Sequence, residues 1–425
     1  MFQGGGNIPL ILPIAARLVA HGHYVRVLAG PGIRLRSAPV SASFQQRVLA
    51  SGAEVVPYQE PSANPHGGAS SPRGLVGGWT PRQLVDASLN APPYRWSPVW
   101  AANVAVQLKQ SPVDVVVADY LLPGALAAAE AAGLPAVALV HGFYKHRPAT
   151  GLPAMYTGFM PARNPLSALR DTLHNAAVHR VYKREALPFL NAARKQLGLA
   201  PLRSPFDQYD RAARVLILAS AALDFPARRL PSNVRYVGTP FDDAGSPAWA
   251  SPWPSEDARP LVVVSLSTLS QGQAPVIRRT LEALAGLPVR ALVTLGPSLV
   301  TAEFHAPPNV ILETFVPHAS VLPQTSGMVT QCGMGTMIKA LAHGVPLVCL
   351  PLLGDQPANA ARAAARGAGV RLGRGATVDQ IRSAIQRVLS EPSFREAANR
   401  ISTELQGEDG AERAAEELEA IAAAG

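Results

Sequence analysis

Short runs of β-branched and other apolar residues alternate with alanine-rich stretches of helical periodicity along most of this chain. This alternation is typical of parallel sheets whose strands are connected by crossover helices. In the first half, it predicts helices over 8–21, 44–51 and 123–132, and strands over 24–29, 53–58, 114–118, 136–140 and 215–220. In the second half, it predicts strands over 261–265, 289–294, 310–313, 327–330 and 347–350, with helices between them. The pattern therefore indicates an α/β protein with two doubly wound units.

Three segments depart from this rhythm. Residues 60–95 are rich in Pro, Gly and Ser, whereas residues 142–185 are helical with Tyr, Phe and Met interspersed. Insertions of this kind often form the walls of a binding pocket. Residues 242–259 are dense in Pro, Ala, Ser and acidic side chains, which indicates a linker. We therefore expect an N-terminal domain over 1–241 and a second domain over 260–400.

The start of the chain is unusual for a doubly wound domain, which needs a strand ahead of its first glycine-rich turn. Here residues 1–3 lead directly into Gly4-Gly5-Gly6, which leaves no room for that strand. We therefore expect the first domain to lack its first strand, through a misplaced start or a truncation.

Composition narrows the class of protein. A chain of 425 residues is long enough for two domains, and 48% hydrophobic against 16% charged residues is a globular composition. The net charge of +9 comes mostly from arginines that form no long basic run, which argues against nucleic-acid binding and suits an anionic small ligand. No apolar run approaches the ~20 residues of a membrane span. The two cysteines, Cys332 and Cys349, provide no disulfide framework, so we expect a cytoplasmic protein without stable membrane insertion.

The clearest candidate chemistry follows the strand predicted over 327–330. This strand runs into Gln331-Cys332-Gly333-Met334-Gly335-Thr336, where a helix begins. Glycines let backbone amides approach a ligand closely, and the start of a helix offers unpaired N–H groups with partial positive charge, which together suit a diphosphate. The Thr336 hydroxyl adds another donor. A Gly-x-Gly turn alone does not distinguish a phosphate site from an ordinary strand–helix turn.

The whole stretch from Phe315 to Asn359 is more specific than this turn. It contains Phe315-Val316-Pro317, the turn at 331–336, Gly344-Val345-Pro346 and Asp355-Gln356; further matches are Gly22-His23, Asp119 with Leu122-Pro123-Gly124, and Ser265-Leu266-Ser267-Thr268. These motifs resemble the nucleotide-sugar signature of family 1 glycosyltransferases with the GT-B fold, particularly bacterial enzymes that decorate antibiotics and other natural products. The resemblance implies two facing Rossmann-like domains with an interdomain cleft, the acceptor on the first and the donor on the second. It also implies a C-terminal helix over 401–425 that packs back on the first domain.

The resemblance assigns a donor site residue by residue. Phe315 would stack on the base, the Val316 backbone would read its edge, and His318 would lie near the ribose. The diphosphate and the sugar would be held by Ser267, Thr268, Gln331, Gly333, Gly335, Thr336, Asp355, Gln356 and Asn359. Of these, the Asp355-Gln356 pair would hydrogen-bond the sugar hydroxyls, and such a pair directly after an apolar strand has no simple structural explanation. For Phe315, a place in the core stays open.

Two positions depart from the family pattern. Gln331 stands where the family has a histidine at the head of the phosphate turn. Its amide can donate a hydrogen bond to phosphate but carries no charge, which weakens donor binding by on the order of 1 kcal/mol. Lys339 stands where plant relatives place a glutamate that holds the ribose hydroxyls. Because lysine accepts no such bonds, a TDP-sugar is as plausible a donor as a UDP-sugar.

The catalytic base is less well marked. Many relatives carry a histidine in the first glycine-rich turn, oriented by an aspartate after a later strand. Here that turn reads Gly5-Gly6-Asn7-Ile8-Pro9, and Asp119 matches the aspartate. Three hypotheses stay open: Asp119 itself acts as the base, His141 or His146 substitutes, or the protein is catalytically weak. The candidate catalytic residues are therefore Asp119, Asn7 and His141.

The sequence contains no Asp-x-Asp motif and no Cys/His cluster with zinc spacing, so neither a metal nor a cofactor is expected. The predicted function is an inverting transfer of a hexose or deoxyhexose from a UDP- or TDP-sugar to a small hydrophobic natural-product acceptor. The alternative is a weakly active or inactive GT-B protein that serves as a binding partner in a biosynthetic pathway. We expect a monomer or homodimer with no nucleic-acid partner.

Overall fold

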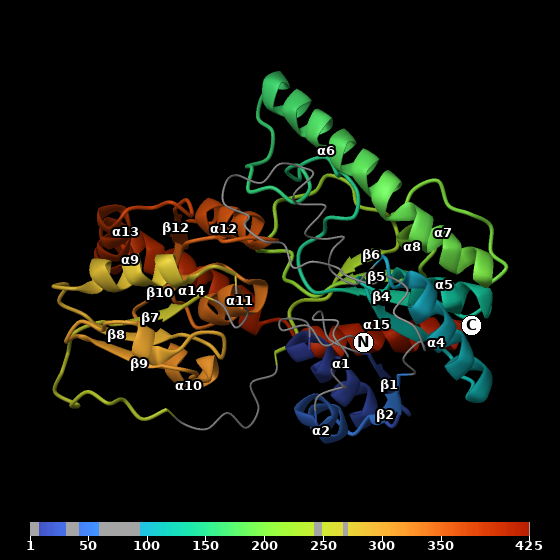
Figure 1. Cartoon of the computed structure of the whole chain (residues 1–425), viewed down its shortest axis with the longest axis horizontal. Helices are drawn as coiled ribbons and strands as arrows, with labels where there is room; N and C mark the ends of the chain where they lie inside the picture. Colours follow the sequence, from blue (N-terminus) through green and yellow to red (C-terminus); the bar gives the residue numbers. More distant parts are fainter. Residues whose placement is uncertain (1–7, 31–41, 59–93, 242–248, 267–270, 425) are drawn as a thin grey trace.

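The computed structural model describes residues 8–30, 42–58, 94–241, 249–266 and 271–424. These residues form two α/β domains, one from the first half of the chain and one from the second (Figure 1). The strands within every sheet run parallel. The predicted α/β architecture with two parallel units is confirmed. Asn7, Ser267 and Thr268, which the sequence singled out, lie outside the described residues.

The C-terminal domain holds a six-stranded sheet in the order β12-β11-β10-β7-β8-β9. Its strands are β7 Leu261–Ser265, β8 Arg290–Thr294, β9 Val310–Glu313, β10 Gly327–Thr330, β11 Leu347–Cys349 and β12 Gly369–Arg371, of which β12 was not predicted. The first of them, β7, lies inside the sheet, and the strand order reverses between β7 and β10. In doubly wound sheets, ligands bind beyond the carboxyl ends of the strands at such a switch point.

Helices cover both faces of this sheet. Val262 and Val264 of β7 share a core with α9 Ala274–Leu284 and α13 Val378–Ser390, whereas Leu261 and Val263 share one with α11 Met334–Ala342 and α14 Pro392–Gln406. A strand buried on both faces must be apolar throughout, which explains the Leu-Val-Val-Val start of β7. The remaining elements are α10 His318–Val321, α12 Gln356–Ala365 and two 3-10 turns, η1 Thr301–Glu303 and η2 Leu322–Gln324.

The N-terminal domain contains two separate sheets. One has the order β3-β4-β5-β6, from β3 Val116–Asp119, β4 Ala136–Val140, β5 Arg214–Ile217 and the unpredicted β6 Val234–Tyr236. The other pairs β1 Arg26–Ala29 with β2 Glu54–Pro57. A cavity of about 540 Å³ lies between β1 and β3.

The helices of this domain are α1 Ile8–Ala20, α2 Ala42–Ala50, α4 Ser97–Gln110, α5 Pro123–Ala131, α6 Pro165–Glu185, α7 Leu187–Gln196, α8 Asp207–Asp210 and α15 Gly410–Ala424. Helix α5 packs on one face of the larger sheet, α1 and α15 pack on the other, and α2 packs on the small sheet. The sequence pattern missed α4, which packs with α5 and α7. The long helix α6 projects away from the sheets (Figure 1). Among the described residues, no helix is both long and apolar enough to cross a membrane.

The chain passes between the domains twice, after β6 and again between α14 and α15. The second passage occurs at residues 407–409, later than the predicted boundary at 401, because α14 continues to Gln406 and packs against α11. Beyond it, α15 runs back beside α1 (Figure 1) and buries Ala414, Leu418 and Ile421 against α1, β4 and β5. The last helix is thus part of the N-terminal core.

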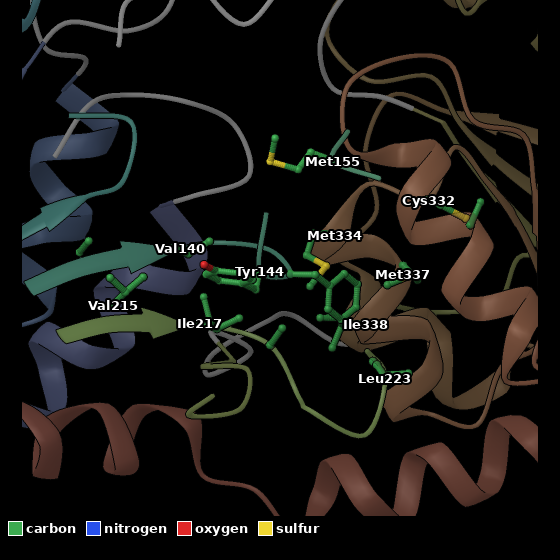
Figure 2. Packing of buried hydrophobic residues seen from close by; sticks show 14 of the residues in the cluster. Val140, Tyr144, Met155, Val215, Ile217, Leu223, Cys332, Met334, Met337 and Ile338 are labelled. Carbon is green, nitrogen blue, oxygen red and sulfur yellow. The ribbon is translucent and has the colours of Figure 1, made fainter. Parts of the chain in front are cut away.

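Side chains from both domains meet in one apolar cluster. Tyr144, which follows β4, lies next to Met334 at the start of α11, with Ile338 on the same helix (Figure 2). A buried ion pair adds to this contact: Arg362 Nη2 of α12 lies 2.7 Å from Asp224 Oδ1 of the N-terminal domain. The start of α11, which carries the candidate phosphate turn, therefore faces the N-terminal domain.

Candidate active site

The predicted phosphate turn lies at the carboxyl end of β10, beside the switch point of the sheet. Gly333 is the residue before α11, and as a glycine it has no side chain to cap the first N–H groups of this helix. Gly335 and Thr336 are in its first turn and are half-buried. Beyond the helix itself, no atom of the residues that the structure describes lies within 4 Å of the position that a Cβ on Gly335 would take. Open space therefore adjoins uncapped helix N–H groups, as an anion site requires.

The head of this turn has an unusual backbone. Cys332 has a φ of 63°, in the left-handed region that non-glycine residues rarely adopt. Its N–H donates to Thr330 Oγ1 at 3.2 Å, and its carbonyl accepts from Asn359 Nδ2 at 2.9 Å. Gln331 is buried, and its Oε1 accepts a bond of 3.3 Å from Thr330 Oγ1. Its Nε2 lies beside Gly333, 3.3 Å from where a Cβ would stand, so the neutral amide is close to the uncapped helix start.

Asn359 connects the phosphate turn to the predicted sugar-binding acid. Its Nδ2 donates both to Cys332 O and to Asp355 Oδ2, each at 2.9 Å. Asn359 is fully buried, whereas Asp355, just before α12, is half-buried. The structure therefore brings the turn at 331–336 and Asp355 together, and Asn359 holds the two in a fixed relation.

Gln356 has a different environment from the one that a sugar-binding side chain would need. It is buried, its Oε1 accepts from the N–H groups of Leu352 and Leu353 at 2.8 and 2.9 Å, and its Nε2 donates to Gln271 Oε1 at 2.9 Å. These bonds shape the loop between β11 and α12. In this structure Gln356 supports Asp355, and contact with a sugar stays a prediction.

The residues predicted for the base and ribose lie between β9 and α10. Phe315 is 69% exposed, which excludes the alternative that it is a core residue. The Val316 side chain is buried, so only its backbone could face a ligand. His318 Nε2 lies 3.2 Å from Ser265 Oγ, at the carboxyl end of the central strand β7. An exposed aromatic ring beyond the carboxyl end of a strand of this sheet suits stacking on a nucleobase.

The two candidate catalytic residues of the N-terminal domain come together at adjacent strand ends. Asp119 is the last residue of β3 and His141 follows β4, and these strands are paired. His141 Nε2 lies 3.4 Å from Asp119 Oδ1, which is within ion-pair distance, but the two atoms do not have the geometry of a hydrogen bond. The Asp119 side chain is completely buried and accepts from the Leu121 N–H at 2.9 Å, whereas the His141 side chain is 18% exposed. The aspartate can therefore orient a histidine that still reaches solvent.

His146, the other histidine considered as a substitute base, does not fit that role. It is 3% exposed, and both ring nitrogens are buried without a hydrogen-bond partner. Burial, with smaller contributions from the charges of Lys145 and His141, lowers the pKa of His146 to about 3. Its ring packs 4.3 Å from that of Tyr209. His146 is therefore a neutral core residue.

Lys145 is a residue near the site that the sequence motifs did not mark. Its Nζ lies 4.9 Å from the ring centre of Tyr120 and 6.0 Å from that of Tyr156. Burial lowers the pKa of Lys145, and the opposing charges that act on it are Asp355 first and Asp119 after it. Charges from both domains therefore act on this ammonium group. The density of polar and aromatic residues directly after β4, His-Gly-Phe-Tyr-Lys-His, was the available signal.

No metal site accompanies these residues. Within the described ranges, no group of three or more His, Cys, Asp and Glu side chains is arranged to hold a metal ion. Lys145 is under the influence of both carboxylates and of Arg362, which is itself paired with Asp224.

Comparison with known proteins agrees with this geometry. A family model described as "UDP-glucoronosyl and UDP-glucosyl transferase" matches residues 96–407. The chain is 28% identical to 4'-demethylrebeccamycin synthase of Lentzea aerocolonigenes over 98% of this chain and 97% of that protein. It is 33% identical to demethyllactenocin mycarosyltransferase of Streptomyces fradiae over 45% and 44% of the two chains. The structure of the glycosyltransferase VinC in complex with DTDP superposes with a TM-score of 0.68 at 22% identity, covering 100% of this chain and 98% of that one.

The family model spans more than half of the chain, and the structural match spans all of it. Both predictions drawn from the motifs, the family and its two-domain architecture, are therefore confirmed. This chain belongs to the UDP-glucuronosyl and UDP-glucosyl transferase family, that is family 1 of the glycosyltransferases, and has the GT-B fold.

Proposed function

We propose that this protein transfers a hexose or deoxyhexose from a UDP- or TDP-sugar to a small hydrophobic natural product. The transfer inverts the configuration at the anomeric carbon and needs no metal ion. The observation that carries the proposal is the arrangement around Asn359, which fixes Asp355 beside the uncapped start of α11. A helix start binds the diphosphate, and a carboxylate next to it binds hydroxyl groups of the attached sugar. The relatives that act on rebeccamycin and lactenocin precursors, by their names, support a natural-product acceptor.

In the proposed reaction, an acceptor hydroxyl oxygen attacks the anomeric carbon while the bond from that carbon to the diphosphate oxygen breaks. The acceptor proton passes to His141, which Asp119 orients from 3.4 Å. The departing diphosphate gains negative charge, which the N–H groups of Gly335 and Thr336 and the dipole of α11 stabilise. The same helix start takes the place that a divalent cation has in metal-dependent transferases. An aromatic carbon of the acceptor could be the nucleophile in place of oxygen.

For the donor, a TDP-sugar is proposed as readily as a UDP-sugar. Lys339, in α11, has no acceptor atom in its side chain for ribose hydroxyls. The exposed Phe315 ring stacks on either base without distinguishing them. Turnover of paired UDP- and TDP-sugars under identical conditions would decide the nucleotide, because only the preferred donor should release its diphosphate rapidly.

The test of the site uses Asp355→Ala and Thr336→Leu. We expect each to abolish release of free nucleotide diphosphate in the presence of donor and acceptor, with the urea-unfolding curve unchanged. Asp379→Ala is the control, because the side chain of Asp379 is 90% exposed on the remote helix α13. Full activity of both site variants would refute the site assignment. Donor binding by the unmodified protein without turnover would instead support the inactive binding partner and overturn the enzymatic proposal.

A further inference from the structure

The exposed apolar side chains of the described residues are concentrated on one segment. Leu166, Leu169 and Leu173 of α6 are 80%, 55% and 62% exposed. Phe159 and Met160, shortly before this helix, are 37% and 39% exposed. The other large hydrophobic residues that are exposed each lie on a different element or loop. Single exposed apolar side chains are ordinary, whereas several together mark an interaction surface.

The three leucines form one stripe on the outer face of α6. Side chains at positions i, i+3 and i+7 of an α-helix lie on the same face. Val178, which is buried, follows Leu169 by nine residues, or about two and a half turns, and so lies on the opposite face. The helix projects away from the sheets, and the half that carries the leucines reaches furthest from them (Figure 1). The stripe therefore faces away from the core of the N-terminal domain.

Phe159 widens this stripe. Its ring centre lies 3.9 Å from Cζ of Arg170, so the ring packs against α6. Arg170 is four residues after Leu166 and three before Leu173, which places it beside the stripe. Phe159, its neighbour Met160 and the three leucines thus make up one apolar surface, which we call the α6 surface.

The charge around the α6 surface is basic. Residues 159–185 contain five Lys and Arg residues against two acidic residues, a net charge of +3. Each acidic residue is paired with the arginine just before it, at 2.7 Å. Arg163, Arg180 and Lys183 are exposed and have no ion-pair partner among the described residues. Arg180 follows Leu173 by seven residues, so the positive charge continues along the same outer face.

An apolar surface bordered by such cations fits a membrane that contains anionic lipids. An amphipathic helix of this kind lies in the plane of the interface, with its apolar side chains among the headgroups and its cations near the lipid phosphates. A second copy of this chain fits less well. A two-fold contact would bring the same face of two copies together. Because the acidic residues of this segment are already paired, neither copy would offer them to the cations of the other.

We propose that the α6 surface binds reversibly to membranes that contain anionic phospholipids. The three leucines enter the boundary between headgroups and acyl chains, and Arg163, Arg180 and Lys183 lie at the headgroup phosphates. The helix lies on the membrane without crossing it, because its opposite face is packed in the N-terminal domain through residues such as Val178. The inference does not rest on the proposed function, since it uses no residue of the candidate active site.

The first test is co-sedimentation with vesicles of equal parts phosphatidylcholine and phosphatidylglycerol. One variant of the full chain carries the substitutions Leu166→Ser, Leu169→Ser and Leu173→Ser. The matched control replaces three exposed apolar residues on other elements, Leu49→Ser, Val106→Ser and Val300→Ser. We expect the leucine variant to bind these vesicles at least about tenfold more weakly than the unmodified protein does. The control should bind them as well as the unmodified protein, and both variants should keep its urea-unfolding curve.

The second test concerns the positive charge. The variant with Arg163→Gln, Arg180→Gln and Lys183→Gln should also bind the same vesicles about tenfold more weakly, because the anionic surface attracts each of these cations. Vesicles of phosphatidylcholine alone should bind the unmodified protein about as weakly as the anionic vesicles bind this variant. The two variants change different residues, so a loss of binding in both would not come from one local disturbance of α6.

Three vesicle results would overturn the proposal. They are equal binding by the unmodified protein and the leucine variant, equal affinity of the unmodified protein for the two kinds of vesicle, and no binding of the unmodified protein to anionic vesicles. Sedimentation velocity without lipid tests the other occupant. A dimer that the leucine substitutions convert to a monomer would show that the α6 surface joins two copies of the chain, and it would overturn the proposal as well.

Discussion

The buried ion pair between Arg362 and Asp224 offers a direct test of how the domains are held together. Arg362 Nε donates to Asp224 Oδ1 at 2.7 Å, and both side chains are less than 5% exposed. Arg362 also lies over the rings of Phe143 at 4.3 Å and Phe225 at 5.1 Å. Replacing Arg362 by Met keeps much of the side-chain volume but leaves the Asp224 carboxylate buried without its cation.

The expected cost follows from this environment. Removing one partner of a buried ion pair typically costs about 3–5 kcal/mol, because the other charge stays buried. Asp224 Oδ1 still accepts from the Phe225 N–H at 2.7 Å, and Tyr236 still donates to Oδ2, which places the loss at the lower end. Loss of the cation–π contacts adds roughly 1 kcal/mol. We therefore expect Arg362→Met to lower the free energy that holds the domains together by about 3–4 kcal/mol.

The assay is urea unfolding together with small-angle scattering, which detects separation of the domains through a larger radius of gyration. Arg387→Met is the matched control, because Arg387 pairs with Glu391 at 2.8 Å on the surface of α13, where both side chains are over 40% exposed. Such a pair contributes about 0.3–0.5 kcal/mol. The double variant Arg362→Met with Asp224→Asn should lose less than the sum of the single variants. A loss below about 1 kcal/mol for Arg362→Met, or an equal loss in the control, would refute the reasoning.

Three further predictions concern the site and the ends of the chain. His141→Gln should lower kcat by about 10²–10⁴-fold with an unchanged unfolding curve and should remove one ionisation from the pH–rate profile, and an unaltered profile would exclude His141 as the base. Phe315→Ala should weaken donor binding, measured by calorimetry, by about 1–2 kcal/mol without loss of stability, since the ring is exposed; unchanged affinity would exclude stacking. The bond with Glu419 raises the pKa of His21 above 6.5, so the stability that this pair contributes is lost as pH rises through the raised value. The same pair lowers the pKa of Glu419 below 4.5, so its contribution is also lost as pH falls through the lowered value. The urea midpoint should exceed that of Glu419→Gln most between pH 4.5 and 6.5, and a difference independent of pH would contradict this.

The sequence predicted the C-terminal domain better than the N-terminal one, for a physical reason. Parallel strands buried on both faces, such as β7 and β10, must be apolar along their whole length and are therefore visible in the sequence. Short edge strands such as β6 and β12 are only three residues long and carry Arg235 and Arg371, so they lack that signal. Helix α4, with Trp100 and Val104 on its buried side, follows a segment rich in Pro, Gly and Ser that hid its start.

The candidate donor residues from Phe315 to Asn359 lie in one continuous stretch that motifs can mark, whereas the contacts of the candidate base depend on the fold. Asp119 and His141 are 22 positions apart, and only the pairing of β3 with β4 brings them within 3.4 Å. A linear motif does not indicate that the Asn359 amide donates hydrogen bonds to Cys332 and Asp355. Nor does it indicate that Gln356 accepts a bond from the loop before α12. These roles come from hydrogen-bond geometry, which a pattern of residue types does not contain.

The position of α15 has a practical consequence for exchanging parts between glycosyltransferases. This helix follows the C-terminal domain in the chain, yet its Leu418 and Ile421 complete the core of the N-terminal domain. A hybrid made with a single junction in the linker would therefore pair one N-terminal domain with a terminal helix from another protein, whose side chains do not match that core. Two junctions, one before Leu261 and one at residues 407–409, would keep α15 and the N-terminal sheet that it covers within a single parent.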